Sequence, residues 1–220
     1  MFRRLFHYIL FLFIFFNTLI LFISCADSVP TLTDVQGRLV LDYSTVESLP
    51  ETRLSVFVKP SVDVGRASYL EVSHVDSGIV WTINNPYILN ASGKNGAGSP
   101  FLMPPYYGQF PSGKYNVTYV DMAGYTAQIN FTLQNLDEFT SCDSVEKLQQ
   151  NLSALEVEKK TVIYTEKAGK GTILYFGDPK DDWTDSNKIA ESYEKAYSYR
   201  DCLFVPTKGL LCLLPPIDVR

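Results

Sequence analysis

Histidine is scarce in this chain of 220 residues, which contains two, and only His74 follows the apolar segment at the start. Catalysis of the Ser/His/Asp or Cys/His kind needs a histidine bonded to the nucleophile. Such a site would have to recruit His74, which follows Val72 and Ser73 at an expected strand end and has no supporting motif such as GxSxG. We therefore expect an ordinary strand or loop histidine, no catalytic residue and no enzyme.

Basic residues are also few. Once Arg3 and Arg4 of the leader are set aside, 17 basic side chains face 24 acidic ones, a net charge of −7. An acidic surface repels phosphates and no basic stripe offsets it, so we expect no nucleic acid partner. Aromatic residues make up 14 % of the chain, which argues for a folded body rather than disorder.

A single long apolar run stands at the N-terminus. Arg3 and Arg4 precede a nearly continuous apolar segment, Leu5 to Ile23, which ends at Ser24 and Cys25. A basic start, an apolar middle and a small residue at a cleavage site are typical of an export signal over residues 1–24. Because positive charge stays on the cytoplasmic side, the rest of the chain is expected on the extracytoplasmic side.

The end of this segment, Leu21-Phe22-Ile23-Ser24-Cys25, resembles the lipobox of bacterial lipoproteins, in which the cysteine is acylated and becomes the new N-terminus. The resemblance implies lipid on Cys25, a tether over residues 25–33 and a cell-envelope location, anchored to a bacterial membrane at its extracytoplasmic face. Stable anchoring needs more than one acyl chain. Phe22 departs from the pattern, where Leu is commonest. Two alternatives stay open: an uncleaved transmembrane anchor, because the run is long enough to span a bilayer, and secretion after cleavage.

Lipid on Cys25 would leave three thiols, Cys142, Cys202 and Cys212, which cannot all pair within one molecule. The segment from Cys202 to Cys212 is typical of two short strands around a Pro-Thr-Lys-Gly turn, so we predict a disulfide between these two residues. The alternative is that all three are buried, reduced thiols. A metal site is not expected at these cysteines, because the sequence has no CxxC pair and no histidine close to them.

Period-two alternation dominates residues 34–135 and predicts an antiparallel β-sandwich. The clearest strand runs from Tyr125 to Leu133 and forms a hairpin with the strand that begins at Tyr115. The stretch 90–99, rich in Gly, Ser and Asn, is expected to be a flexible loop. Four further expected strands lie at spacings typical of a sandwich, namely 39–43, 54–58, 70–72 and 78–83.

The stretch Phe110-Pro-Ser-Gly-Lys-Tyr-Asn-Val-Thr-Tyr-Val-Asp-Met-Ala-Gly124 resembles the last two strands of bacterial immunoglobulin-like and fibronectin type III-like domains. The resemblance implies that fold for residues 34–135 and puts Tyr115 at the tyrosine corner. No cysteine occurs between Ala26 and Ser141, so the inter-sheet disulfide of antibody domains is absent. A fold of this kind implies no particular activity.

Residues 136–220 mix helix and strand patterns, unlike the alternating segment before them, and predict a small α+β unit. Asp143 is expected to cap a helix with an apolar stripe from Val145 to Leu155, and Asp182 to begin a second helix that reaches Tyr197. Two strands are expected around the 168–171 turn, before the Cys202 hairpin. The overall prediction is a mainly β protein with a small α+β C-terminal unit.

Two segments are candidates for binding. Residues 101–110 concentrate aromatic rings and prolines, and Tyr106, Tyr107 and Phe110 are our candidate ligand-binding residues, although rings beside proline also commonly close a core. Residues 178–185 hold four aspartates, but their spacing does not match a calcium loop, and first-turn acids of a helix explain them. We expect no metal and no cofactor.

The sequence therefore predicts a lipid-anchored extracytoplasmic protein that acts as a non-enzymatic binding or structural module of the cell envelope. Its expected partners are the membrane, through the lipid, and an envelope protein or a glycan. The alternative is a carbohydrate-binding or carbohydrate-acting protein that uses residues 101–110 or 178–185. An acid pair acting on glycosides must stand apart across a cleft, whereas these acids crowd one turn.

Overall fold

The structure is a computed structural model that describes residues 28–91, 94–105, 108–183 and 186–219. Within these ranges no helix has the length and apolar character needed to cross a membrane. The predicted signal, the predicted acylation site Cys25 and the candidates Tyr106 and Tyr107 lie outside the described residues.

The chain is mainly β, as the alternation predicted, and its strands form two sheets. The smaller sheet has the order β4-β3-β7-β8 and the larger one β10-β9-β11-β12-β1-β2-β6-β5, with β13 paired to β11. The strands are β1 Leu32–Asp42, β2 Glu51–Pro60, β3 Ala67–His74, β4 Val80–Ile83, β5 Tyr87–Ala91, β6 Lys94–Leu102, β7 Gly113–Asp121, β8 Thr126–Leu133, β9 Glu158–Tyr164, β10 Ile173–Gly177, β11 Ser198–Val205, β12 Leu210–Leu213 and β13 Ile217–Asp218. The helices are α2 Asp137–Thr140, α3 Val145–Leu152 and α4 Ser186–Ser192, with 3₁₀ turns at Val64–Arg66, Lys167–Gly169 and Pro206–Lys208.

The first eight strands have the immunoglobulin-like order. If β1 to β8 are lettered A, B, C, C′, D, E, F and G, one sheet contains A-B-E-D and the other C′-C-F-G. This is the antiparallel sandwich that the resemblance implied. The stretch 90–99, expected to be a loop, instead belongs largely to β5 and β6, because its glycines let β6 lie close against β2.

Tyr115 occupies the tyrosine corner at the start of β7. Its ring is fully buried and its Oη donates a hydrogen bond of 2.6 Å to the carbonyl of Pro111, four residues upstream. The ring stacks on Phe131 of β8, with centroids 5.0 Å apart. Burial raises the pKa of the Tyr115 phenol, so the hydroxyl remains protonated and available as a donor.

The C-terminal strands continue the larger sheet. β12 pairs with β1 in parallel, and β11 and β12 form the predicted hairpin. The main core contains β12 and β11 residues such as Leu210 and Val205 beside sandwich residues such as Leu41, together with Phe139 of α2 and Leu148 of α3. The sheet and its core therefore run across residue 135, where the sequence predicted the boundary between two units.

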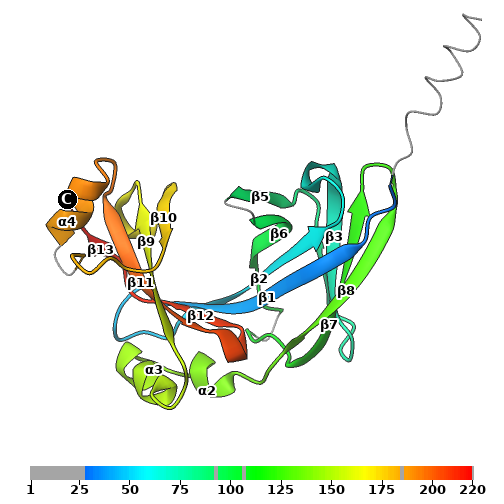
Figure 1. The fold of residues 1–220 in the computed structure, drawn as a ribbon. Coiled ribbons are helices and arrows are strands. Elements are labelled where there is room, and N and C mark those ends of the chain that lie inside the picture. The colour runs from blue at the N-terminus through cyan, green and yellow to red at the C-terminus, as the bar shows by residue number, and fades with distance from the viewer. Residues whose placement is uncertain (1–27, 92–93, 106–107, 184–185, 220) are drawn as a thin grey trace, which may run out of the picture.

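The larger sheet is strongly bent. Figure 1 shows its two ends, β5 and β10, rising on the same side of β12, while α2 and α3 lie on the other side. The α3 cap is Ser144 rather than the predicted Asp143, because Ser144 Oγ accepts from Lys147 N, whereas Asp143 forms an ion pair with Lys147 Nζ at 2.7 Å. The second predicted helix is shorter than expected: α4 ends at Ser192, before Tyr197.

Replacement of Tyr115 by Phe should destabilise the protein by about 1 kcal/mol, because the Pro111 carbonyl loses its donor. Tyr119→Phe is the matched control, since the Tyr119 hydroxyl is buried and has no hydrogen-bond partner among the described residues. Its removal should be neutral or stabilising. Urea denaturation measures both, and equal losses would contradict the tyrosine-corner assignment.

Candidate functional site

One face of the larger sheet is covered by the sandwich core and, at its β9–β10 end, by a separate cluster of Ile163, Trp183, Ile189 and Ala196. The other face lies inside the bend. Leu39 and Leu41 of β1 belong to the main core, whereas Val40 belongs to a second cluster on the opposite side. We call the side that carries Val40 the inner face. Strand register and alternation extend this face along the sheet to Phe57 of β2, Leu89 of β5, Phe101 of β6, Phe204 of β11, Val162 of β9 and Phe176 of β10.

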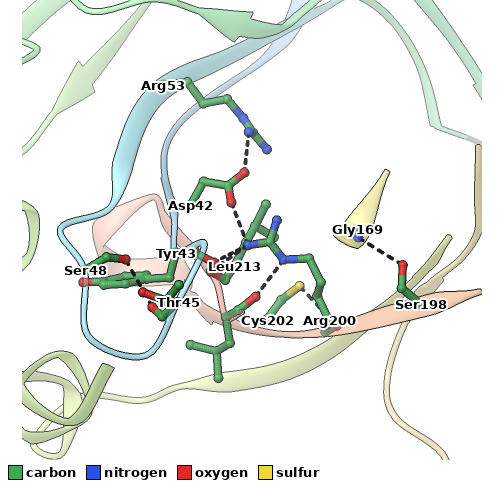
Figure 2. Close-up of polar contacts among 11 residues, drawn as sticks. Asp42, Tyr43, Thr45, Ser48, Arg53, Gly169, Ser198, Arg200, Cys202 and Leu213 are labelled. Carbon is green, nitrogen blue, oxygen red and sulfur yellow. Dashed lines mark hydrogen bonds and ion pairs between the residues drawn. The ribbon is translucent and has the colours of Figure 1, made fainter. Parts of the chain in front are cut away.

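A buried ion pair lies at the bottom of the inner face (Figure 2). Arg200 of β11 is only 5 % exposed, and its Nη2 is 2.6 Å from Asp42 Oδ1 of β1. The same guanidinium donates to the backbone carbonyls of Tyr43 at 2.7 Å and, through Nε, Leu214 at 2.7 Å. A buried charge is tolerated when it is paired and fully hydrogen-bonded, so this arrangement fixes β11 against the end of β1.

Two further arginines lie over aromatic rings on the inner face. Arg53 of β2 reaches Asp42 Oδ2 at 2.8 Å, and its guanidinium carbon is 5.3 Å from the ring centre of Phe101. Arg38 of β1 lies 4.7 Å from the ring centre of Phe204. Burial lowers the pKa of Arg38. Stacked cations of this kind hold rings in fixed orientations.

The inner face exposes apolar side chains toward both ends of the sheet. At one end these are Tyr87 and Leu89 of β5 with Phe101 of β6, and at the other Ile173 and Phe176 of β10, all between 43 % and 64 % exposed. A soluble surface rarely gathers large apolar groups in this way unless it binds something. No sequence pattern indicated this surface, because β5, β6 and β10 contribute to one face only after long-range strand pairing and bending of the sheet.

A hollow of about 140 Å³ lies on the same face where β1, β2, β5 and β6 meet. Phe57 and Leu89 line it together with the polar residues Asp34, Gln36, Lys59 and Asn95. The available sequence signal was the alternation of Gly96 and Gly98 within an otherwise strand-like segment, which often marks close backbone approach.

Of the three candidate ligand-binding residues, the structure describes Phe110. It is half-buried, packs against the main core and lies 5.7 Å from Trp81 between ring centres. Tyr106 and Tyr107 lie outside the described residues. Ligand binding by this segment therefore stays a prediction.

The predicted disulfide between Cys202 and Cys212 is wrong. Both thiols are free and fully buried, and Cys202 pairs with Leu213 across the hairpin while Cys212 pairs with Leu203. This register turns the two sulfurs to opposite faces of the sheet, because successive residues of a strand alternate. Burial raises the pKa of each thiol to about 12, so both remain protonated at neutral pH.

The acidic segment that begins at Asp178 is held by a lysine. Lys160 Nζ lies 2.8 Å from Asp178 Oδ1, and Asp181 borders a groove of about 590 Å³ that Lys159 and Lys180 also line. In the described part of the chain, no three His, Cys, Asp or Glu side chains are grouped so that they could hold a metal ion.

His74 is a structural residue at the end of β3. Its ring is 3 % exposed, with Nδ1 2.8 Å from Ser77 Oγ and Nε2 3.1 Å from the Ser112 carbonyl. Both ring nitrogens are therefore used within the fold.

Replacement of Asp42 by Ala should destabilise the protein by about 3 kcal/mol, because it leaves the Arg200 charge buried and unpaired. Glu51→Ala is the control: Glu51 is exposed and lies directly opposite Asp42 on β2, so its loss should cost about 0.5 kcal/mol or less. Thermal and urea unfolding provide the comparison. A similar loss of unfolding free energy in the two variants would contradict the structural role of Asp42.

No protein-family model, curated protein or solved structure matches this chain.

Proposed function

We propose that this protein is a lipid-anchored lipoprotein of a bacterial cell envelope that acts outside the cytoplasm as a non-enzymatic binding or structural module. Acyl chains on Cys25 would hold it to the membrane, and residues 25–33 would serve as the tether. The inner face would hold the partner, an envelope protein or a glycan.

The observation that carries the binding role is the exposure of Phe101, Ile173 and Phe176 on one bent surface. Single exposed apolar residues are ordinary, but rings presented from both ends of one sheet form a complementary surface for a partner. The ion pair of Arg200 with Asp42 supports this role because it keeps the two ends in a fixed relation. Preorganised surfaces of this kind lose little conformational entropy on binding.

A carbohydrate ligand is the second candidate. The hollow beside Phe57 is a better carbohydrate site than the acidic segment 178–185, because an apolar wall and several polar side chains meet in the hollow.

Replacement of Cys25 by Ser should abolish incorporation of radiolabelled palmitate, because the acylated thiol is lost. Cys142→Ser is the matched control, since that thiol lies in the folded body, and it should leave labelling unchanged. Palmitate on the Cys25→Ser protein would contradict the lipoprotein assignment.

Replacement of Phe101 and Phe176 by Ser should abolish partner binding without unfolding the protein, because both rings are more than half exposed. Cross-linking in intact cells, followed by purification from membranes, measures the partner. The control pair is Val80→Ser with Met122→Ser, exposed apolar residues of the smaller sheet and its connecting turn. An identical set of cross-linked partners in both double variants would contradict binding at the inner face.

A further inference from the structure

The hollow beside Phe57 is a slot built by strand register. On the inner face, Phe57 of β2 lies opposite Gly98 of β6, and Gly96 lies opposite Leu89 of β5. Side chains therefore rise from β2 and β5, while β6 between them contributes only glycines. Neighbouring strands lie about 4.8 Å apart, so the two walls stand on backbones roughly 10 Å apart.

Close approach to β2 leaves little room for side chains on this part of β6. A Cβ at Gly98 would overlap the Val56 carbonyl, stand 2.7 Å from Phe57 Cα and meet the Phe57 ring, which covers this position. A Cβ at Gly96 would lie 3.3 Å from the Val58 carbonyl, a tight contact. The floor of the slot is therefore the backbone at Gly96, and the space above it is about 140 Å³, enough for several water molecules.

Polar side chains of β1 and β2 border the slot. Gln36 Nε2 donates to Asp34 Oδ2 at 3.4 Å, and Gln36 Oε1 accepts from Arg38 Nη2 at 3.1 Å. This chain of contacts along β1 orients the Gln36 amide. Lys59 lies directly opposite Asp34 on β2. The border thus offers both donors and acceptors, and its one acid and one base balance in charge.

We propose that this slot is a saccharide subsite that takes one neutral pyranose ring, standing on edge between Phe57 and Leu89. A pyranose has apolar C–H faces and a polar rim of hydroxyl groups. A ring stands about 3.5–4 Å from each wall that it touches, which suits walls two strands apart. Its hydroxyls would meet Asp34, Gln36 and Lys59. This inference rests on the proposed extracytoplasmic binding role and names the ligand class for one end of the inner face.

An apolar chain fits the same slot poorly. It would desolvate the three bordering polar side chains without replacing their hydrogen bonds, and each unsatisfied group costs about 1–3 kcal/mol. An anionic ligand gains little from a border whose charges cancel. An extended peptide is the competing macromolecular ligand, and the experiment includes it.

The test is saturation-transfer NMR on the full chain, purified in an amine-oxide detergent because detergents with sugar headgroups would compete. The probes are the methyl glycosides of glucose, galactose, mannose and N-acetylglucosamine at millimolar concentration, and a proline-rich peptide. We expect transfer to the ring C–H protons of at least one glycoside. No transfer to any of the four, or transfer to the peptide alone, would overturn the proposal.

Variants locate the site. Phe57→Ala should weaken glycoside binding at least about tenfold, whereas Tyr69→Ala, a half-buried aromatic residue of the smaller sheet, should leave it unchanged. If Phe57→Ala fails to fold, Leu89→Ser at an exposed position provides the test, with Val80→Ser on β4 as its control. Unchanged binding in a folded slot variant would overturn the proposal. If partner cross-linking to the inner face persists in that case, the proposed binding role is supported and only the saccharide assignment is wrong.

Discussion

The contact between Arg200 and Asp42 is the interaction on which the bent sheet depends. β12 adds to β1 in parallel, and β11 and β9 follow it, so the C-terminal strands extend a sheet that begins inside the sandwich. Arg200 fixes this junction by bonding a carboxylate of β1 and backbone carbonyls just beyond β1 and β12. The charge is nearly fully buried, so the geometry is demanding: the pair is favourable only while every partner is in place.

The same junction gives the two faces of the sheet different roles. One face packs on the smaller sheet, α2 and α3, and contains the large core with Tyr115 and Phe139. The other face keeps a small buried cluster around Val40 and Leu213 at the bottom of the bend and exposes rings toward the ends. Between the buried cluster and the exposed ends, Arg53 lies over the ring of Phe101 and Arg38 over the ring of Phe204. A rigid floor with apolar ends is a suitable arrangement for a binding surface.

Alternation carried much of the fold prediction, because inward and outward residues of a half-buried strand differ in polarity. The β7–β8 hairpin follows from this pattern and is confirmed. The Tyr115 corner, which the family resemblance implied, and the Cys202 hairpin, which its turn residues indicated, are confirmed as well. The segment 90–99 was misread as a loop because glycine signals a turn as readily as a close strand contact. The Cys202–Cys212 disulfide was wrong because spacing across a hairpin does not reveal which face each thiol occupies. Phe110 packs beside Trp81 and stays half-buried, and local composition cannot distinguish a ring that closes a core from one that faces a ligand.

The sequence by itself determined the mainly β class, the immunoglobulin-like hairpins and the capped helix near residue 145, because each depends on patterns within a few neighbouring residues. Its basic start and apolar N-terminal run are the basis for the proposed extracytoplasmic location. Only the tertiary structure decided that β12 joins β1, that Arg200 meets Asp42 and that Phe57, Gly96 and Leu89 share one slot. These contacts join residues far apart in the chain, and their geometry depends on sheet register and bending, which no local pattern specifies.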